Sequence, residues 1–401
     1  MAHLILFDNE NRDNFLPLAF TRPVCELRVG ILTIREKWQM ALQGEVAYIT
    51  QDYLAGKFPI DYGEENILIN GSVLPSPQLI KLIQQMEYNE AFLRGEELIA
   101  AKLNGEQLEQ LIHDEDFGEL KGFDLQDTEY LKLDHVWDLF KINAEALRQD
   151  FEMITKGRTS APISSTNQVL GKENVFLEEG ASVECCTINA TTGPVYIGKN
   201  ALVMEGVMIR GPLAIGENST IKMGAKVYGA TTLGPYCKIG GEVKNSILQG
   251  YSSKSHEGYL GDAAIGEWCN LGADTNNSNL KNNYEEVKMW NYGANSFAKT
   301  GMQFCGLVMG DHSKTGINTM LNTGTMVGVS TNVFGSEFPR NFIPSFAWGG
   351  YKGFQTYRAD KAFDTMERVM ARRNVEFGVE DRIIMLRIFE DSSKYRRWEV
   401  K

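Results

Sequence analysis

The chain has 401 residues, 43% of them hydrophobic and 23% charged, an ordinary balance for a globular protein of two or three domains. Its net charge of −12 at pH 7 argues against a general binder of nucleic acid or anionic membranes, because such binders need a basic face. A small phosphorylated substrate stays compatible with this charge, since a pocket can be locally basic.

Targeting signals and cysteine motifs are not evident. No apolar run reaches membrane-spanning length, and residues 1–7 lack the pattern of a secretory signal, so we expect a cytoplasmic protein without membrane partners. None of the six cysteines forms a C-x-x-C pair, so buried, reduced thiols are expected rather than a zinc site.

Residues 1–156 are expected to form an α/β domain, because short apolar strands alternate with helical patterns. Pro77 stands near the start of one helical pattern, where its missing N–H is not needed. Gly95 separates two short strands, which is typical of a hairpin turn. The predicted strands are residues 3–7, 46–49 and 67–70, the hairpin covers 92–100, and the predicted helices are 33–42, 77–87 and 139–154.

A linker and a repeat region follow. Residues 157–173 include a small, polar stretch with one proline, so they are interpreted as a linker. Residues 174–335 carry aliphatic residues at intervals of six, which neither a helix nor an ordinary strand produces. A triangular coil with three short faces does, so we predict a left-handed parallel β-helix of hexapeptide repeats. The longest run is Ile197, Val203, Ile209, Ile215, Ile221, Val227, Leu233 and Ile239.

Two regions depart from this interval. Between residues 276 and 301 it is lost and polar residues dominate, which predicts a projecting loop of the kind that often carries function. Residues 336–401 hold two helical patterns, and we expect them to form a helical cap over the open end of the coil.

The chain has only five histidines, and His256 stands where the interval of six breaks. An aliphatic β-helix interior leaves little room for an imidazole, so we expect His256 on a surface or in a cleft. It could remove a proton from a nucleophile there, because histidine titrates near neutral pH. The alternative is a solvated or structurally hydrogen-bonded histidine.

Three segments around this histidine carry a family resemblance. They are residues 242–244 (E-V-K), 256–262 (H-E-G-Y-L-G-D) and 270–275 (N-L-G-A-D-T). Their residues and separations resemble E-x-K, H-x-x-Y-L-G-D and N-I-G-A-G-T. These motifs belong to the acetyltransferase half of the bifunctional N-acetylglucosamine-1-phosphate uridyltransferase/glucosamine-1-phosphate acetyltransferase family.

The resemblance implies a transferase of UDP-N-acetylglucosamine biosynthesis that moves an acetyl group from acetyl-CoA to the amine of glucosamine-1-phosphate. His256 matches the family's general base, and the backbone amide of Ala273 matches the position that approaches the acetyl group. The family's β-helix is trimeric, with coenzyme A between neighbouring coils, so a homotrimer is implied. The residues matching sugar or phosphate contacts are Lys226, Lys244, Tyr259, Asn270 and Asn279.

The same segments also depart from the family pattern. Asp274 replaces a glycine, and residues 279–281 keep only the asparagine of the family's N-Y-D. Another amino sugar or another acyl group therefore stays open.

The N-terminal region has a resemblance of its own. Residues 12–23 resemble the signature R-x-x-P-L-T-x-x-x-P-K of sugar-phosphate nucleotidyltransferases, which implies a Rossmann-like domain with Arg12 and Arg22 near a nucleotide. The preceding loop has acids in place of glycines, Val24 replaces the lysine, and Ser72 replaces an aspartate that would bind Mg²⁺. Both uridylyl transfer from UTP and binding without chemistry stay open.

Two further classes fit a β-helix. One is a trimer with a degenerate sugar-nucleotide domain and a regulatory or binding role, in which His256 would support no activity. The other is a β-helix carbonic anhydrase, which needs three histidines around zinc. The predicted β-helix contains only His256 and His312, so that class is a weak match and no metal site is predicted.

Overall fold

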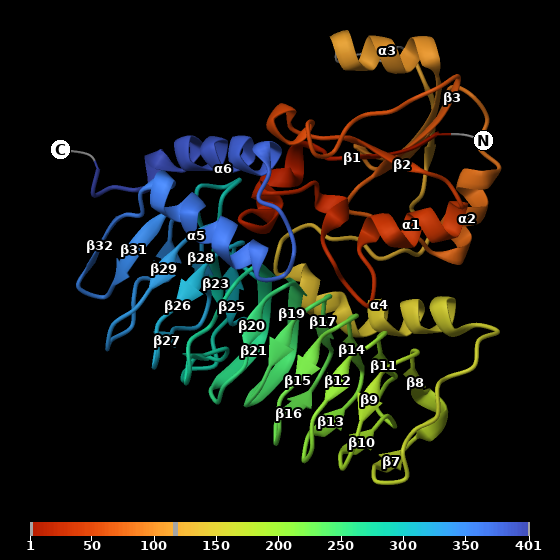
Figure 1. The fold of residues 1–401 in the computed structure, drawn as a ribbon. Helices are drawn as coiled ribbons and strands as arrows, with labels where there is room; N and C mark the ends of the chain where they lie inside the picture. Colours follow the sequence, from red (N-terminus) through yellow and green to blue (C-terminus); the bar gives the residue numbers. More distant parts are fainter. Residues whose placement is uncertain (1–2, 115–118, 400–401) are drawn as a thin grey trace. The chain divides into compact units, whose positions relative to one another are not determined.

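The computed structural model describes residues 3–114 and 119–399, and the chain divides into two compact units. The first is built mainly from the chain up to Asp134; the second contains Asp13–Phe20, Arg28–Ile31 and the chain from His135 onward. The elements of both are drawn in Figure 1. The predicted fold class, an α/β domain followed by a β-helix and C-terminal helices, is confirmed.

The first unit contains a mixed six-stranded sheet with strand order β2-β1-β3-β5-β4-β6. β1 pairs in parallel with both neighbours, and its residues Leu4, Ile5 and Leu6 are buried. The β4–β5 hairpin turns at Gly95, where φ is +62°, as predicted. The strands are β1 (His3–Phe7), β2 (Val46–Ile49), β3 (Glu65–Asn70), β4 (Glu90–Arg94), β5 (Glu97–Asn104) and β6 (Lys121–Asp124).

Helices α1, α2 and α3 complete the regular structure of this unit. α1 begins where Thr33 and Glu36 form a reciprocal capping box. The sequence predicts α1 and α2 but not α3 or β6. The four side chains of β6 are all exposed, so the strand lacks an alternating apolar pattern. The helices are α1 (Ile34–Leu42), α2 (Pro77–Gln84) and α3 (Gly105–Asp114).

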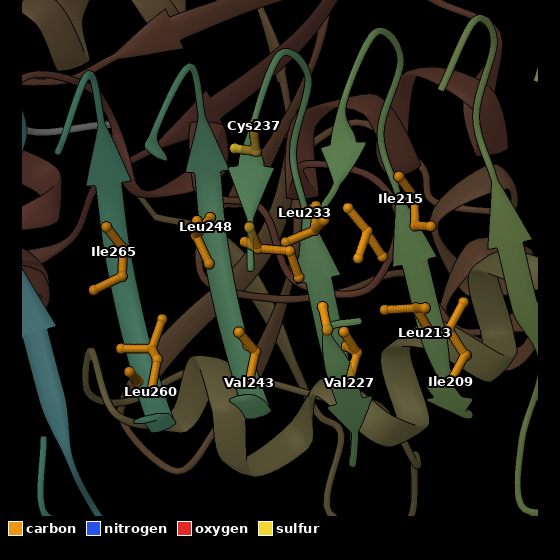
Figure 2. Close-up of a cluster of buried hydrophobic side chains, with 14 of the residues drawn as sticks. Ile209, Leu213, Ile215, Val227, Leu233, Cys237, Val243, Leu248, Leu260 and Ile265 are labelled. Atoms are coloured by element: carbon orange, nitrogen blue, oxygen red, sulfur yellow. The ribbon is translucent and has the colours of Figure 1, made fainter. Parts of the chain in front are cut away.

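The second unit is a parallel β-helix in which each coil places short strands over those of the coil before. Equivalent aliphatic residues pair from coil to coil, as Val203 does with Ile221 and Ile221 with Ile239. These side chains are at most 1% exposed and fill the interior, which explains the interval of six. Figure 2 shows such side chains, among them Ile209 and Ile265, in the buried core.

Two strands of the β-helix are longer than the rest. β19 and β21 have nine residues each. The first part of β19 pairs with β16, and its later part, from Ile247, pairs with β17. The strands up to this point are β7 (Gln168–Leu170), β8 (Val175–Leu177), β9 (Ser182–Val183), β10 (Thr187–Asn189), β11 (Val195–Ile197), β12 (Leu202–Val203), β13 (Met208–Arg210), β14 (Leu213–Ile215), β15 (Thr220–Ile221), β16 (Lys226–Tyr228), β17 (Thr231–Leu233), β18 (Lys238–Ile239), β19 (Glu242–Gly250), β20 (Ser253–Lys254) and β21 (Tyr259–Glu267).

Coil strands also occur outside the predicted range 174–335. β7 lies within the predicted linker and pairs with β10, while β30 and β31 follow the range and pair with β28 and β29. The later strands are β22 (Asn276–Asn277), β23 (Lys288–Asn291), β24 (Ser296–Lys299), β25 (Leu307–Met309), β26 (Lys314–Thr315), β27 (Met320–Leu321), β28 (Thr325–Val327), β29 (Asn332–Val333), β30 (Phe342–Ile343), β31 (Ala347–Gly350) and β32 (Gly353–Thr356).

The predicted projecting loop is partly ordered into an antiparallel hairpin, β23–β24. Met289 of this hairpin is buried, and Trp290 stacks on Phe342 with ring centroids 4.2 Å apart. The hairpin is thus anchored by apolar contacts that the polar composition of the loop does not reveal.

Three longer helices belong to the second unit. α4 was predicted to close the first domain, yet it clusters with the β-helix. Asn143 of α4 accepts a hydrogen bond from the Gly30 amide at 2.7 Å and donates one to the carbonyl of Ala230 at 2.7 Å. The two helical patterns of the tail are confirmed as α5 and α6. The helices are α4 (Asp138–Thr155), α5 (Ala359–Ala371) and α6 (Val379–Asp391).

One cysteine differs from the expectation of buried thiols. Five are buried, but Cys185 is exposed and lies in the turn between β9 and β10 with a φ of +55°. Turn geometry, not the interval of six, decides this position. Among the helices of residues 3–114 and 119–399, none combines the length and apolar character that crossing a bilayer requires.

Candidate active site on the β-helix

Three strands that are neighbours in one sheet of the β-helix, β16, β19 and β21, bring predicted site residues into register. Lys226 of β16 pairs with Glu242 of β19, which pairs with Tyr259 of β21. Lys244 lies two residues beyond Glu242 on the same strand. Side chains alternate along a strand, and the intervening valines and leucine are buried inside the coil. Lys226, Lys244 and Tyr259 therefore lie on one outer face.

Asp262 joins three of the predicted residues. Its Oδ2 accepts a hydrogen bond from Asn279 Nδ2 at 2.5 Å and lies 3.5 Å from Lys244 Nζ. Asn279 Nδ2 also lies 2.8 Å from the Tyr259 hydroxyl, to which it donates. Asn245 Nδ2 donates to Asp262 Oδ1 at 2.7 Å. We call these five residues the Asp262 cluster.

Asp262 is the last residue of the motif H-E-G-Y-L-G-D but is not among the predicted site residues. It is 4% exposed and has a φ of +48°. Glycine, asparagine and aspartate adopt this left-handed conformation more often than other residues do. A buried carboxylate needs charged or hydrogen-bonding partners, and the cluster supplies them. The last residue of H-x-x-Y-L-G-D is the signal that could have identified it.

The two tyrosines on this face stay protonated at neutral pH. Tyr228 donates a hydrogen bond to Glu242 at 2.6 Å, and this bond raises the pKa of Tyr228 to about 12. Burial, followed by the nearby charge of Asp262, raises the pKa of Tyr259 well above its usual range. The Tyr228 proton is donated to Glu242, whereas the Tyr259 phenol accepts from Asn279 and keeps its own proton to donate.

Lys244 is held from two sides. Besides Asp262, it faces the ring of Phe304, whose centroid lies 4.5 Å from Nζ. Phe304 is 43% exposed and follows the β23–β24 hairpin in the chain. An ammonium has three donors, so Lys244 can serve a ligand without leaving these partners. Together with the amides and phenols, this face suits a polar, hydroxyl-rich ligand.

His256 lies in the turn between β20 and β21, three residues before Tyr259, and is exposed. The turn has four residues, 255–258, whereas the equivalent turn of the preceding coil has two, Gly240 and Gly241. Turns 204–207 and 222–225 of the regular coils also have four residues, so the turn of the preceding coil is the short one. His256 lies in a turn outside the aliphatic interior, as predicted. No hydrogen bond or ion pair joins its side chain to the Asp262 cluster within the described residues.

Ala273 lies in the turn that stacks on the His256 turn, because the Asp274 amide donates to the Glu257 carbonyl at 2.9 Å. The Ala273 carbonyl accepts from the Asn318 amide at 2.8 Å, whereas its own amide has no acceptor in the described part of the chain. A free amide in such a turn can donate to an acyl oxygen. Asn270 is exposed and lies on another face, where its backbone pairs with Ser253 and Lys314.

In the first unit, the predicted residues take part in internal contacts. Arg12 donates to the Tyr53 hydroxyl at 2.7 Å and lies 3.5 Å from Asp8. Arg22 is 8% exposed and contacts the Thr21 hydroxyl at 3.4 Å. Burial raises the pKa of Asp8, even though hydrogen bonds from Thr50 and from the Val24 amide favour its charged form. These contacts tie the loop after β1 to its neighbours.

The position where the resemblance expects a metal-binding carboxylate holds a serine. Ser72 is buried and donates its hydroxyl to Asn70 Oδ1 at 2.8 Å. The nearby carboxylate of Glu97 accepts from Asn9 at 2.8 Å and pairs with Lys132 at 2.5 Å. Over residues 3–114 and 119–399, no three acidic, histidine or cysteine side chains gather closely enough to hold a metal.

Comparisons with known proteins add a family match for the first part of the chain. A family described as sugar nucleotidyl transferase matches residues 4–159. No curated protein matches. Among solved structures, the UDP-N-acetylglucosamine acyltransferase of Arabidopsis is 13% identical over 60% of this chain and 98% of that chain, with a TM-score of 0.29. A mutant GDP-perosamine N-acetyltransferase from Caulobacter crescentus, in complex with CoA and GDP-perosamine, is 12% identical over 89% of this chain and 96% of that chain. Its TM-score is 0.16.

Proposed function

We propose that the protein acylates the amine of an amino sugar, with acetyl-CoA as donor and glucosamine-1-phosphate as the first acceptor to test. The observation that carries the proposal is the Asp262 cluster. Lys244 and Asn279, expected from the family resemblance to contact the sugar phosphate, meet at one carboxylate, and Asn279 links Tyr259 to it. His256 precedes Tyr259 by a single short turn.

His256 is the proposed general base. The amine of the sugar attacks the thioester carbonyl, and as the C–N bond forms the imidazole of His256 takes one proton from the nitrogen. The negative charge that develops on the carbonyl oxygen is stabilised by the free amide of Ala273. The C–S bond then breaks, and the departing thiolate receives the proton from His256 to give free coenzyme A.

The remaining predicted residues bind the acceptor in this proposal. Lys244 and Lys226 offer ammonium groups to a phosphate, for which a compact point charge is suitable. Tyr259 and Asn279 serve the sugar hydroxyls through the donors and acceptors that the cluster leaves available. Asn270 is proposed as a further contact to the sugar. The homotrimer implied by the resemblance stays a prediction, to be measured by light scattering.

For the first unit, we propose binding of a nucleotide or sugar phosphate without a chemical reaction. Its match to sugar nucleotidyl transferases supports binding of a nucleotide or sugar phosphate near Arg12 and Arg22. Ser72, which stands where a metal-binding carboxylate is expected, favours binding without chemistry over uridylyl transfer from UTP. Pyrophosphate release from UTP and N-acetylglucosamine-1-phosphate tests this: release at enzymatic rates would establish uridylyl transfer.

Thiol release from acetyl-CoA, with and without glucosamine-1-phosphate, tests the acyl transfer. We expect sugar-dependent release that falls about 100-fold or more in His256→Ala, because loss of a general base typically costs 10²–10⁴. His113→Ala, an exposed histidine of α3, is the matched control and should retain full activity. Release that persists in His256→Ala, or none with any amino-sugar phosphate, would contradict the proposal and favour a binding assembly.

A further inference from the structure

One interior column of the β-helix contains a charged residue. On one face of the coil, the inward-pointing residues of successive coils pair in register, and Lys254 pairs directly with Ile239. Lys254 is 2% exposed, like the aliphatic residues above and below it. The column runs Val183, Val203, Ile221, Ile239, Lys254 and Leu271.

The ammonium group of Lys254 reaches two backbone turns. Its Nζ donates to the carbonyl of Gly240 at 2.9 Å and to the carbonyl of His256 at 2.7 Å. Within the described residues, Lys254 supplies the hydrogen bond to the His256 carbonyl. Bonds from a charged donor are roughly twice as strong as neutral ones. The side chain thus ties the His256 turn to the turn of the preceding coil.

Packing does not explain a lysine at this position. An aliphatic side chain fits the column on both neighbouring coils. Burial of the ammonium lowers the pKa of Lys254 to about 8, with Glu257 and Asp274 acting in the opposite direction. The charged form is therefore disfavoured inside the coil, although it still predominates at neutral pH. A residue that opposes stability in this way calls for another role.

We propose that Lys254 is a positioning residue that holds the four-residue turn 255–258 and thereby sets the location of the His256 imidazole. The effect on catalysis rests on the proposed acyl transfer; the effect on the turn does not. The preceding turn, Gly240–Gly241, is two residues shorter than this one, so the two turns do not stack residue for residue, and the Lys254 bonds link them.

The first test compares Lys254→Met with Ile239→Met in the full chain. Methionine fills the same column in both, but only the first variant removes the bonds to the turns. Amide hydrogen exchange in the segment 253–262 should accelerate tenfold or more in Lys254→Met and stay unchanged in Ile239→Met. In NMR spectra, the His256 imidazole signal, assigned by its loss in His256→Ala, should shift or broaden only in Lys254→Met. Unchanged exchange and an unchanged imidazole signal would overturn the proposal.

The second test measures acyl transfer. We expect kcat to fall tenfold or more in Lys254→Met, with KM for acetyl-CoA within twofold of the wild type, because the base is displaced while the donor site is intact. We expect kcat of the wild type to decline above pH 8, where Lys254 loses its proton, and we expect no such decline in this variant. Equal kcat in both methionine variants would refute positioning. If the wild type transfers no acyl group, the proposed function fails, and exchange with NMR still decides the role of Lys254.

Discussion

The coils before β19 and the coils that carry the candidate site share the same β-helical backbone but differ in the residues that they bury. In the earlier coils, Val203, Ile221 and Ile239 stack in register and fill the interior. In the later coils, Lys254 enters the interior, and Asp262 is buried among hydrogen-bonding partners. The β-helical backbone tolerates such departures because each coil contacts only its neighbours, so a local change stays local.

The comparison predicts that the regular coils determine stability. Ile221→Ala should reduce the free energy of unfolding by about 2–5 kcal/mol, because it removes a buried side chain and leaves a cavity. The folded fraction should keep its acyl-transfer rate per active site. Met223→Ala, in the adjacent turn and 66% exposed, should change stability little. Denaturant unfolding of both variants measures the difference, and equal losses would break the comparison.

Asp262→Ala, in contrast, should mainly reduce activity. We expect kcat/KM to fall about 30- to 100-fold, equivalent to ~2–3 kcal/mol, because Lys244 and Asn279 lose their shared partner. Glu205→Ala removes an exposed carboxylate of a regular coil and serves as the control. Steady-state kinetics with varied acceptor distinguishes the two. An Asp262 variant that is as active as the control would place the site elsewhere.

The pH dependence of stability should separate the two regions as well. The pKa of Lys254 is about 8 in the folded chain and near 10.5 in the unfolded chain. Between these values the unfolded state binds more protons, so stability from this group rises with pH. Lys254→Met should therefore be more stable than the wild type at pH 7 by on the order of 1–3 kcal/mol. The gap should narrow by pH 10; a constant gap would show that Lys254 does not titrate in this range.

The smallest expected effect concerns a single hydroxyl. Tyr259→Phe removes one partner of Asn279 and should reduce kcat/KM about fivefold, equivalent to ~1 kcal/mol. Tyr196→Phe removes the hydroxyl that donates to Glu178 at 2.7 Å in a regular coil. It should change stability slightly and activity not at all. Matched losses of activity in both variants would remove the distinction between regular and site-bearing coils.

Local signals predicted much of the first unit. Residues 3–7 and 46–49 form strands with the predicted bounds, because both are short apolar runs; β1, in the sheet interior, is the more deeply buried of the two. β6 and α3 lack that signal, since β6 is exposed on every side chain and α3 begins at a glycine in a polar stretch. The placement of α4 depends on Asn143, whose partners lie far away in the chain.

The β-helix and the residue types around His256 could be recognised from the amino-acid sequence alone. An interval of six is the direct imprint of inward positions that recur on every face of the coil, so it can be recognised without contacts. The folded structure was needed to show that Lys244 and Asn279 meet at Asp262, that Asn279 links Tyr259 to them, and that Lys254 bonds to the His256 turn. Those bonds depend on the register between coils and on burial, which bring together residues that no local period relates.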